Sequence, residues 1–388
     1  MSTPSDEAAV AQVLVSADGT DWRDISSVIT SVNVEDHEML TDQALIVIDD
    51  SMGILAHASF EGLKVQTTLG WVAEKATIFE GDVTAAKAIT QTEGSRVELT
   101  ALDFSNRMSQ RTPDPPMEWH SGETLTKVVE SIVKRQEYGF KATEIIPKTD
   151  PKYDDDHPLR QANQNDLAFV QDLATRAACL TFVEFSDKAK GSKFFFVPIE
   201  RVASAKPIGL INGCRSGGDL MSFKLERIGS SGYVERTASA TDPVTGEVVT
   251  HKTPPAPERP PIPPPEPGKH SGASESQLRG LDALTELAAA ADKRLKAEKK
   301  PVAAEASTPD DAGAKVVPDP RRVLGLQATG TARGTPLLRA KSRVTIEDVA
   351  PWATGDWYVT KVNHIYTRER ISTDRHRNSY STTFVATR

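Results

Sequence analysis

The chain has 388 residues, of which 38% are hydrophobic and 26% are charged, and its net charge at pH 7 is −8. This length exceeds that of a usual single core, so about two to four domains are expected. No apolar run reaches the roughly 18 residues that suggest a membrane span, and the first residues, MSTPSDEAAV, lack the basic and apolar regions of a secretion signal.

The charge is unevenly distributed along the chain. Residues 321–388 carry 12 Lys or Arg against 5 Asp or Glu. The arginines are scattered along alternating strands without stacking aromatic residues, which disfavours sequence-specific recognition of nucleic acid. A basic segment that meets acidic neighbours across a subunit interface fits the pattern at least as well, and an overall acidic balance suits a conduit that a polyanion passes without sticking.

The two cysteines, Cys179 and Cys214, do not have metal-ligand spacing. This usage favours two reduced thiols in a protein made in a cytoplasm.

Residues 1–110 are predicted to form an antiparallel β domain. Apolar and β-branched runs of strand length alternate with turn residues. The expected strands are residues 13–16, 21–25, 44–49, 64–71, 77–84 and 96–103, with Ile29, Val32 and Val34 in a further apolar pattern. About seven strands without intervening helices indicate a barrel or a sandwich.

Residues 111–205 are predicted to form an α+β insert. Ser121 is the expected cap of a helix with a complete apolar stripe. Asn163 or Asn165 is the expected cap of a second helix, after which two strands at 181–185 and 194–198 flank a turn. The apolar stripe of the first helix is Leu125, Val128, Val129, Ile132 and Val133, and that of the second is Leu167, Val170, Leu173, Ala174 and Ala177.

Strand-like segments then resume, stop at a proline-rich stretch, and return near the end of the chain. They are residues 208–211, 221–227 and 233–239, and later 337–340, 344–347, 357–364, 365–368 and 379–387. We therefore expect one β domain, residues 206–252 and 321–388, with an insertion at 253–320. Prolines in HKTPPAPERPPIPPPEPGKH favour extended polyproline II structure, and an Ala/Leu-rich amphipathic helix follows at 278–295. Its leucines step by three and four without a sustained heptad, so a long coiled coil is not expected.

Two segments carry a family resemblance. Gln161, Asn163, Asp166, Leu167 and Phe169 match a Q-x-N-x-x-D-hydrophobic-x-F pattern, and GDWYVTKVNH at 355–364 nearly reproduces G-x-Y-x-V-x-x-V-x-H. In these segments the chain resembles the phage late control protein D family. These proteins are tail hubs of contractile tails, related to the T-even tail hub and to the base of type VI VgrG spikes. Segments 42–49, 79–83 and 121–125 agree with the family in the same order, and Gly334, Pro336 and Leu338 stand near its G-x-P-x-L pattern.

The resemblance implies a fold, an assembly and partners. The fold is α+β and β-rich, with two tail-tube-like antiparallel β-barrel domains joined by the α+β insert and the Pro-rich helical insertion. The implied assembly is a homotrimer in the tail baseplate of a virion, put together in the host cytoplasm. It would connect a hexameric inner tail tube to a separate trimeric spike protein. Baseplate wedge proteins and the tape measure protein are further implied neighbours, and the 278–295 helix either packs on its own domain or docks a subunit or a baseplate protein.

Few residues are candidates for catalysis or ligand binding, and we assign no catalytic, cofactor-binding or metal-binding residue. The chain lacks G-x-S-x-G, H-E-x-x-H, Walker and C-x-x-C motifs. Asp154, Asp155 and Asp156 lack the spacing of a calcium loop, so a solvated acidic loop is expected. Side chains of residues 35–38, Glu-Asp-His-Glu, alternate along a strand, which favours a turn or interface role, and His364 is expected to be structural. Gly217 and Gly218 form a turn outside the strand–loop–helix context of phosphate binding.

Two other classes of function stay open. A tail-associated lytic enzyme would depend on a carboxylate, for example Asp154 or Glu35, because paired carboxylates are defined by distance in space. An extracellular binding module, such as an adhesin, would instead bind a cell surface.

Overall fold

A computed structural model describes residues 8–91, 94–120, 122–153, 155, 158–211, 218–227, 236–241, 247–252, 274–298, 302–305, 320–321, 324–349, 353–372 and 375–388. The chain divides into two compact units. The first comprises Met1–Leu225, Gln327–Glu347 and Gly355–Thr387, and the second comprises Glu226–Leu326, Asp348–Thr354 and Arg388. None of the helices in the described ranges is long and apolar enough to cross a membrane.

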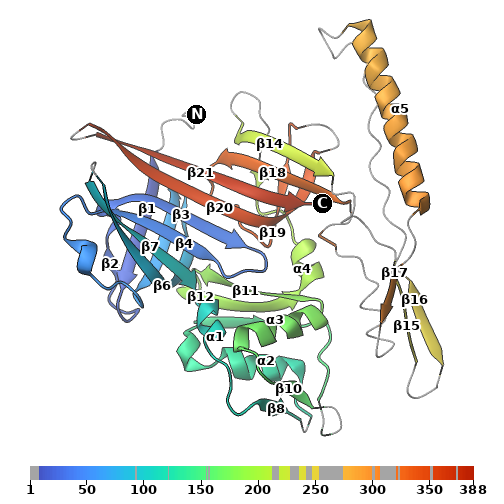
Figure 1. The fold of residues 1–388 in the computed structure, drawn as a ribbon, viewed down its shortest axis with the longest axis horizontal. Coiled ribbons are helices and arrows are strands. Elements are labelled where there is room, and N and C mark those ends of the chain that lie inside the picture. The colour runs from blue at the N-terminus through green and yellow to red at the C-terminus, as the bar shows by residue number, and fades with distance from the viewer. Residues whose placement is uncertain are drawn as a thin grey trace. The chain divides into compact units, whose positions relative to one another are not determined.

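A large sheet forms most of the first unit (Figure 1). Its main path runs in the order β14-β18-β21-β20-β3-β4-β7-β6-β5-β1-β2, and β13 and β19 are attached beside β20. The strands are β1 (Ala9–Ser16), β2 (Arg23–Asp24), β3 (Ile29–His37), β4 (Gln43–Asp49), β5 (Lys64–Trp71), β6 (Lys75–Gln91), β7 (Gly94–Asp103), β13 (Leu210–Ile211), β14 (Leu220–Arg227), β18 (Leu326–Arg333), β19 (Ser342–Ile346), β20 (Gly355–Ser372) and β21 (Arg375–Thr387). From β18 to β2 every pairing along the path is antiparallel.

The antiparallel, β-rich class expected from the sequence is confirmed, but the path of paired strands does not return on itself. Within the described ranges the sheet is therefore open, and the closed barrels expected from the resemblance are not seen as hydrogen-bonded circuits.

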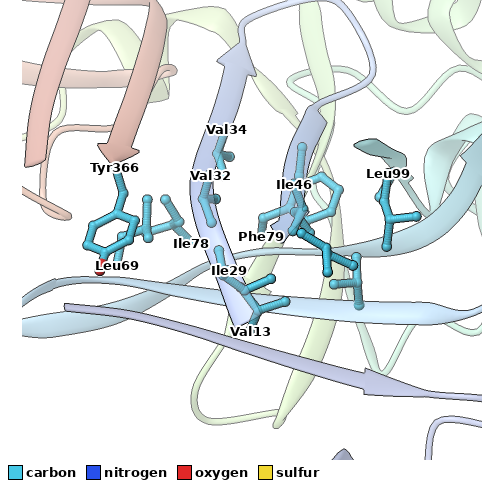
Figure 2. Close-up of a cluster of buried hydrophobic side chains, with 14 of the residues drawn as sticks. Val13, Ile29, Val32, Val34, Ile46, Leu69, Ile78, Phe79, Leu99 and Tyr366 are labelled. Atoms are coloured by element: carbon cyan, nitrogen blue, oxygen red, sulfur yellow. The ribbon is translucent and has the colours of Figure 1, made fainter. Parts of the chain in front are cut away.

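The alternation of side chains along a strand explains which residues of the first strands are buried. β4 and β5 bury every second residue, because successive side chains of a strand point to opposite faces. The buried faces meet in one core, in which Val13, Ile29, Val32, Ile46 and Leu99 lie together (Figure 2).

The C-terminal strands complete this same core. β20 pairs with β3, so that Ile365 lies opposite Asn33, and Tyr366 and Tyr380 join the apolar cluster of the first strands. The two predicted β domains thus share one sheet. Their division into 1–110 and 206–252 with 321–388 stays a prediction.

Some predicted strands were wrong in detail. Residues 337–340 are not a strand, because Leu338 N–H donates to the Thr335 carbonyl and Ala340 N–H donates to a carboxylate. Conversely, β18 was missed because its Ala and Gly residues have weak strand propensity. Gly330 in this strand is required by packing, since a Cβ there would lie 2.3 Å from the Phe384 ring. Residues 357–364 and 365–368 form one strand, β20, rather than two.

The predicted α+β insert carries its own apolar core, which includes Trp119, Val129 and Phe169. The helix α1 (Ser105–Ser109) lies just before it, and its elements are β8 (Met117–Trp119), α2 (Leu125–Val133), β9 (Ala142–Ile145), β10 (Leu159–Gln161), α3 (Asp166–Arg176), β11 (Cys179–Ser186), β12 (Gly191–Pro198) and α4 (Ile199–Ala203). The described part of this unit also contains the 3-10 turns η2 (Ser26–Val28), η3 (Leu55–His57) and η4 (Gln136–Tyr138).

The structure confirms only one of the two predicted helix caps. Asn165 caps α3, and its Oδ1 accepts from the Ala168 N–H at 2.8 Å. The cap of α2 is Thr124, whose side chain accepts from the Lys127 N–H. The prediction of Ser121 as this cap was wrong, and Ser121 itself lies outside the described residues.

The second unit contains a small sheet and a long helix. Its sheet has the order β16-β15-β17, formed by β15 (Arg236–Thr241), β16 (Val248–Lys252) and β17 (Val302–Glu305). The predicted helix is confirmed as α5 (Glu275–Glu298), whose Leu281, Leu284 and Leu287 are exposed. Packing of these leucines against the helix's own domain is therefore not seen in the described residues.

Candidate functional site: a buried ionic cluster

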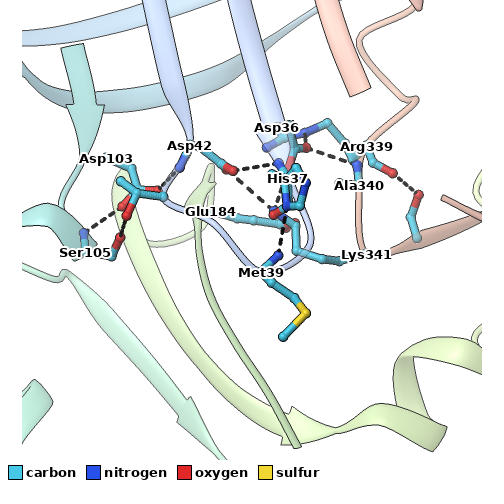
Figure 3. Close-up of polar contacts among 12 residues, drawn as sticks. Asp36, His37, Met39, Asp42, Asp103, Ser105, Glu184, Arg339, Ala340 and Lys341 are labelled. Carbon is cyan, nitrogen blue, oxygen red and sulfur yellow. Dashed lines mark hydrogen bonds and ion pairs between the residues drawn. The ribbon is translucent and has the colours of Figure 1, made fainter. Parts of the chain in front are cut away.

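Charged side chains from distant parts of the chain gather at one end of β3. Asp36 lies near the end of this strand, and Arg339 and Lys341 lie in the segment between β18 and β19 (Figure 3). Asp36 Oδ1 is 2.5 Å from the Lys341 ammonium, and Asp36 Oδ2 is 2.7 Å from Arg339 Nε. The Ala340 N–H also donates to Asp36 Oδ2 at 3.1 Å. Asp36 and Lys341 side chains are both 1% exposed, so their attraction is little screened by water.

Two more buried carboxylates connect the cluster to neighbouring strands. Asp42, before β4, accepts from the His37 N–H at 2.8 Å and lies 3.5 Å from Lys341 Nζ. Asp103, at the end of β7, accepts from the backbone N–H groups of Asp42 and Ser105, each at 2.6 Å. These bonds order the β3–β4 turn and the start of α1.

Glu184 connects the insert to the same ionic cluster. It lies on β11, and its Oε1 is 3.9 Å from Lys341 Nζ. Lys341 therefore faces carboxylates from β3, from the start of β4 and from the insert. The cluster joins three segments that are far apart in the sequence.

The cations in the cluster remain charged. Burial alone would lower the pKa of the Lys341 ammonium, but Asp36 and Asp42 raise it above its ordinary value. Burial alone would raise the pKa of Asp36, but Lys341 and Arg339 hold it well below its usual range. A lysine held in its protonated form is a poor nucleophile, so this arrangement is suited to holding elements together rather than to covalent chemistry.

The pKa values of the other three carboxyl groups of the cluster, Asp42, Asp103 and Glu184, are raised instead. Burial raises the pKa of Asp42 well above its ordinary value, and Asp36 and Asp103 add to this rise against the effect of Lys341. Burial likewise raises the pKa of Asp103. Carboxylates that share one buried site disfavour each other's ionisation.

The residues at 35–38 do not converge, as their alternation on a strand predicted. Asp36 and Glu38 are buried, and Glu38 accepts from the Tyr358 hydroxyl at 3.1 Å. Glu35 instead forms an ion pair with Lys361 at 2.7 Å, and both side chains are partly exposed to solvent. The buried role of Asp36 was missed, because its partners lie about three hundred positions later in the chain.

The other sequence candidates are not brought together. Asp155 is exposed and lies 3.6 Å from His120 Nδ1, whereas Asp154, Asp156, Cys214 and Gly217 fall outside the described residues. In the ranges that the structure describes, no group of three or more His, Cys, Asp or Glu could hold a metal ion. Burial raises the pKa of the Cys179 thiol to about 11, which makes this cysteine unreactive.

His364 is completely buried on β20. Its Nδ1 lies 2.8 Å from the Tyr380 hydroxyl, and its ring stacks on that of Tyr380. Burial, together with the positive charge of Arg339, lowers the pKa of His364 to about 3. These contacts favour the structural role predicted from the sequence.

The burial of His364 makes stability depend on pH. Because its folded pKa of about 3 lies below the ordinary 6.5, the unfolded chain binds more protons between these values, and stability falls as the pH is lowered. We expect wild type to lose about 2 kcal/mol more than His364→Gln between pH 7 and pH 5, measured by urea unfolding at both values. His57→Gln, at an exposed position, should keep the wild-type dependence. Equal slopes for wild type and His364→Gln would contradict the prediction.

The motif that carried the resemblance forms a second buried network. Asp166, at the first position of α3, is fully buried and accepts from Gln161 Nε2 at 2.9 Å, from the Tyr138 hydroxyl and from Arg135. Phe169 stacks on Trp119 with 5.3 Å between the ring centroids. The Q-x-N-x-x-D spacing thus places a glutamine on β10 beside the carboxylate that begins the next helix.

No family model and no curated protein matches the chain. Solved structures do match. A tail protein from Neisseria meningitidis MC58 is similar over 98% of this chain and 97% of its own length, with a TM-score of 0.61 and 10% identity. The 43 kDa tail protein of prophage MuSo2 from Shewanella oneidensis is similar over 98% of both chains, with a TM-score of 0.61 and 11% identity.

A secretion protein has a similar structure. The E. coli c3393 protein, a component of the type VI secretion system, is similar over 92% of this chain and 73% of its own, with a TM-score of 0.51 and 13% identity. Together these likenesses show that the chain has the fold of tail proteins, and they confirm the β-rich α+β class that the sequence resemblance implied.

Proposed function

We propose that this protein is the baseplate hub of a contractile phage tail or a related injection system. Three copies would form a ring that adapts the hexameric inner tube to a trimeric spike and leaves a central conduit. The function is structural, and its location is the tail baseplate of a virion.

The observation that carries the proposal is the extent of the structural likeness. Two tail proteins of nearly the same length, one of them from a prophage, are similar to this chain over 98% of its residues. The likeness to a type VI secretion component supports a role common to both kinds of injection apparatus. Fold alone does not define function, so the assembly itself must be tested.

Symmetry gives a physical reason for such a ring. A closed ring of three copies, each with two tube-like parts, presents six similar surfaces on one side and three identical ones on the other. This arrangement requires the two β parts, 1–110 and 206–252 with 321–388, to have equivalent places in the ring. The expected partners are the tube protein, the trimeric spike and baseplate wedge proteins, with the tape measure protein as a possible occupant of the conduit.

The first expected result concerns mass in solution. We expect the purified chain, alone or mixed with its spike protein, to form a trimer of about three times 42.1 kDa by light scattering. A chain that stays monomeric with the spike and tube proteins would contradict the hub. Turnover of peptidoglycan by the purified chain would favour the lytic enzyme, and saturable binding to cells would favour the adhesin.

A further inference from the structure

The last residue of β18 carries a shielded guanidinium nitrogen that lacks an acceptor. Arg333 stacks on Trp71, with 4.1 Å between its Cζ and the centroid of the indole ring. Its Nη2 is shielded from solvent and has no hydrogen-bond partner among the residues that the structure describes. A shielded donor on a charged group is costly to leave unpaired. We therefore expect an acceptor close to this nitrogen.

Arg333 lines a pocket in the first unit. The pocket has a volume of about 250 Å³, and the Trp71 ring and several aliphatic side chains form part of its wall. Glu74 and Asp219 also line it, but neither carboxylate bonds to Arg333 Nη2. We call this space the seam pocket, because Trp71 belongs to β5 and Arg333 to β18, near the two ends of the strand path.

Side chains bridge the two ends of the open sheet beside this pocket. Trp71 Nε1 donates to the Gly334 carbonyl at 2.6 Å, and the Trp71 ring lies 6.1 Å from that of Tyr380 on β21. Asn378 Nδ2, also on β21, donates to the Ala9 carbonyl on β1 at 3.0 Å. In the described part of the chain, the two ends of the sheet thus meet through side chains and not through a ladder of backbone hydrogen bonds.

The register of β1 directs the preceding residues towards the seam pocket. Ala9, the first residue of β1, lies directly opposite Trp71, so the two side chains share one face of the sheet. Ala9 and Val13 belong to the apolar core on this face. Because side chains alternate along a strand, an extended chain before Ala9 places Glu7 on the same face and Asp6 on the other. Two extended residues advance about 7 Å, which carries Glu7 past Trp71 towards the guanidinium that stacks on it.

We propose that residues 1–7, which precede the described part of the chain, lie across the seam pocket, and that the Glu7 carboxylate accepts a hydrogen bond from Arg333. Asp6 and Glu7 are the two carboxylates of this segment, and alternation selects Glu7. A bond between two charged groups is of the strong kind. It joins the chain before β1 to the end of β18 and so closes the open sheet through side chains. The inference does not depend on the proposed ring of three copies.

Carbodiimide cross-linking of the full-length chain tests which carboxylate meets position 333. In Arg333→Lys a primary amine replaces the guanidinium, and the reagent joins an amine only to a carboxylate in direct contact with it. We expect peptide mass spectrometry to find an amide bond between position 333 and Glu7. Adding Glu7→Gln should abolish this bond, whereas the matched control Asp6→Asn should leave it in place. A bond to Glu74 or Asp219 instead, or no bond at all, would overturn the proposal.

A double-mutant cycle measures the same pair without a reagent. Glu7→Gln removes a charged acceptor, so it should raise the equilibrium constant for unfolding in urea roughly tenfold in the wild-type background. In the Arg333→Gln background the same change should have no effect, because its partner is already absent. Asp6→Asn should leave the constant unchanged in both backgrounds. Equal effects of Glu7→Gln in the two backgrounds, or no effect in either, would show that the two side chains do not meet and would overturn the proposal.

Discussion

Replacing Asp36 by Ala is expected to lower the free energy of unfolding by about 3–5 kcal/mol. The change leaves the Lys341 ammonium, which is 1% exposed, without its nearest counter-ion, while Arg339 loses the bond from its Nε. A buried charge that has lost its partner pays the full cost of its lost hydration. Urea denaturation, followed by tryptophan fluorescence, measures the effect.

Glu35→Ala is the matched control for Asp36→Ala. Glu35 is the preceding residue on β3, and its ion pair with Lys361 is about 40% exposed on both sides. Exposed pairs contribute only about 0–1 kcal/mol, so this variant should stay near wild type. If Asp36→Ala lowered the free energy of unfolding no more than Glu35→Ala does, the prediction would fail. The cluster would then not hold together the sheet, the insert and the segment before β19.

Replacing Asp166 by Ala is expected to destabilise the insert by about 3–5 kcal/mol. Arg135 and the Tyr138 hydroxyl both lose their acceptor in the interior, and Gln161 Nε2 keeps only the Gln164 carbonyl. Because these groups lie on α2, η4, β10 and α3 or beside them, the loss should appear first in the insert. Hydrogen exchange measured by mass spectrometry would show faster exchange of the α2 and α3 amides.

Asp172→Ala provides the control on the same helix. Asp172 pairs with Arg176 one turn later, at the surface, and a pair of this kind is worth about 0.3–0.5 kcal/mol. Unchanged exchange of α2 in Asp166→Ala would show that the motif does not hold the two helices together. The prediction would then have to be abandoned, although the fold of the insert would stand.

Local patterns were sufficient for most elements of this fold. Alternating burial in residues 64–71 is visible in the sequence, because every second side chain must be suited to the interior when one face of a strand is covered. The stripes of α2 and α3 are equally visible, since apolar residues repeat at helical spacing. The order of family-like segments also predicts the tail-protein fold.

Positions that depend on partners far away in the chain could not be predicted. In the sequence Asp36 is one of three acidic residues in the segment 35–38, and nothing near it identifies Arg339 and Lys341 as its partners. Residues 337–340 have strand-like composition, yet the backbone there turns to place Ala340 N–H on Asp36. A strand-like composition carries no information about such a contact.

The sequence by itself determined most of the strands and helices of the sheet and insert and the family-like order of segments, since propensity and periodicity are local properties. Only the tertiary structure decided that β20 pairs with β3 in one open sheet, and that Asp36 and Asp166 are buried centres of ionic networks. Pairing and burial depend on which segments meet after the chain has folded. For that reason neither could be obtained from one stretch of residues at a time.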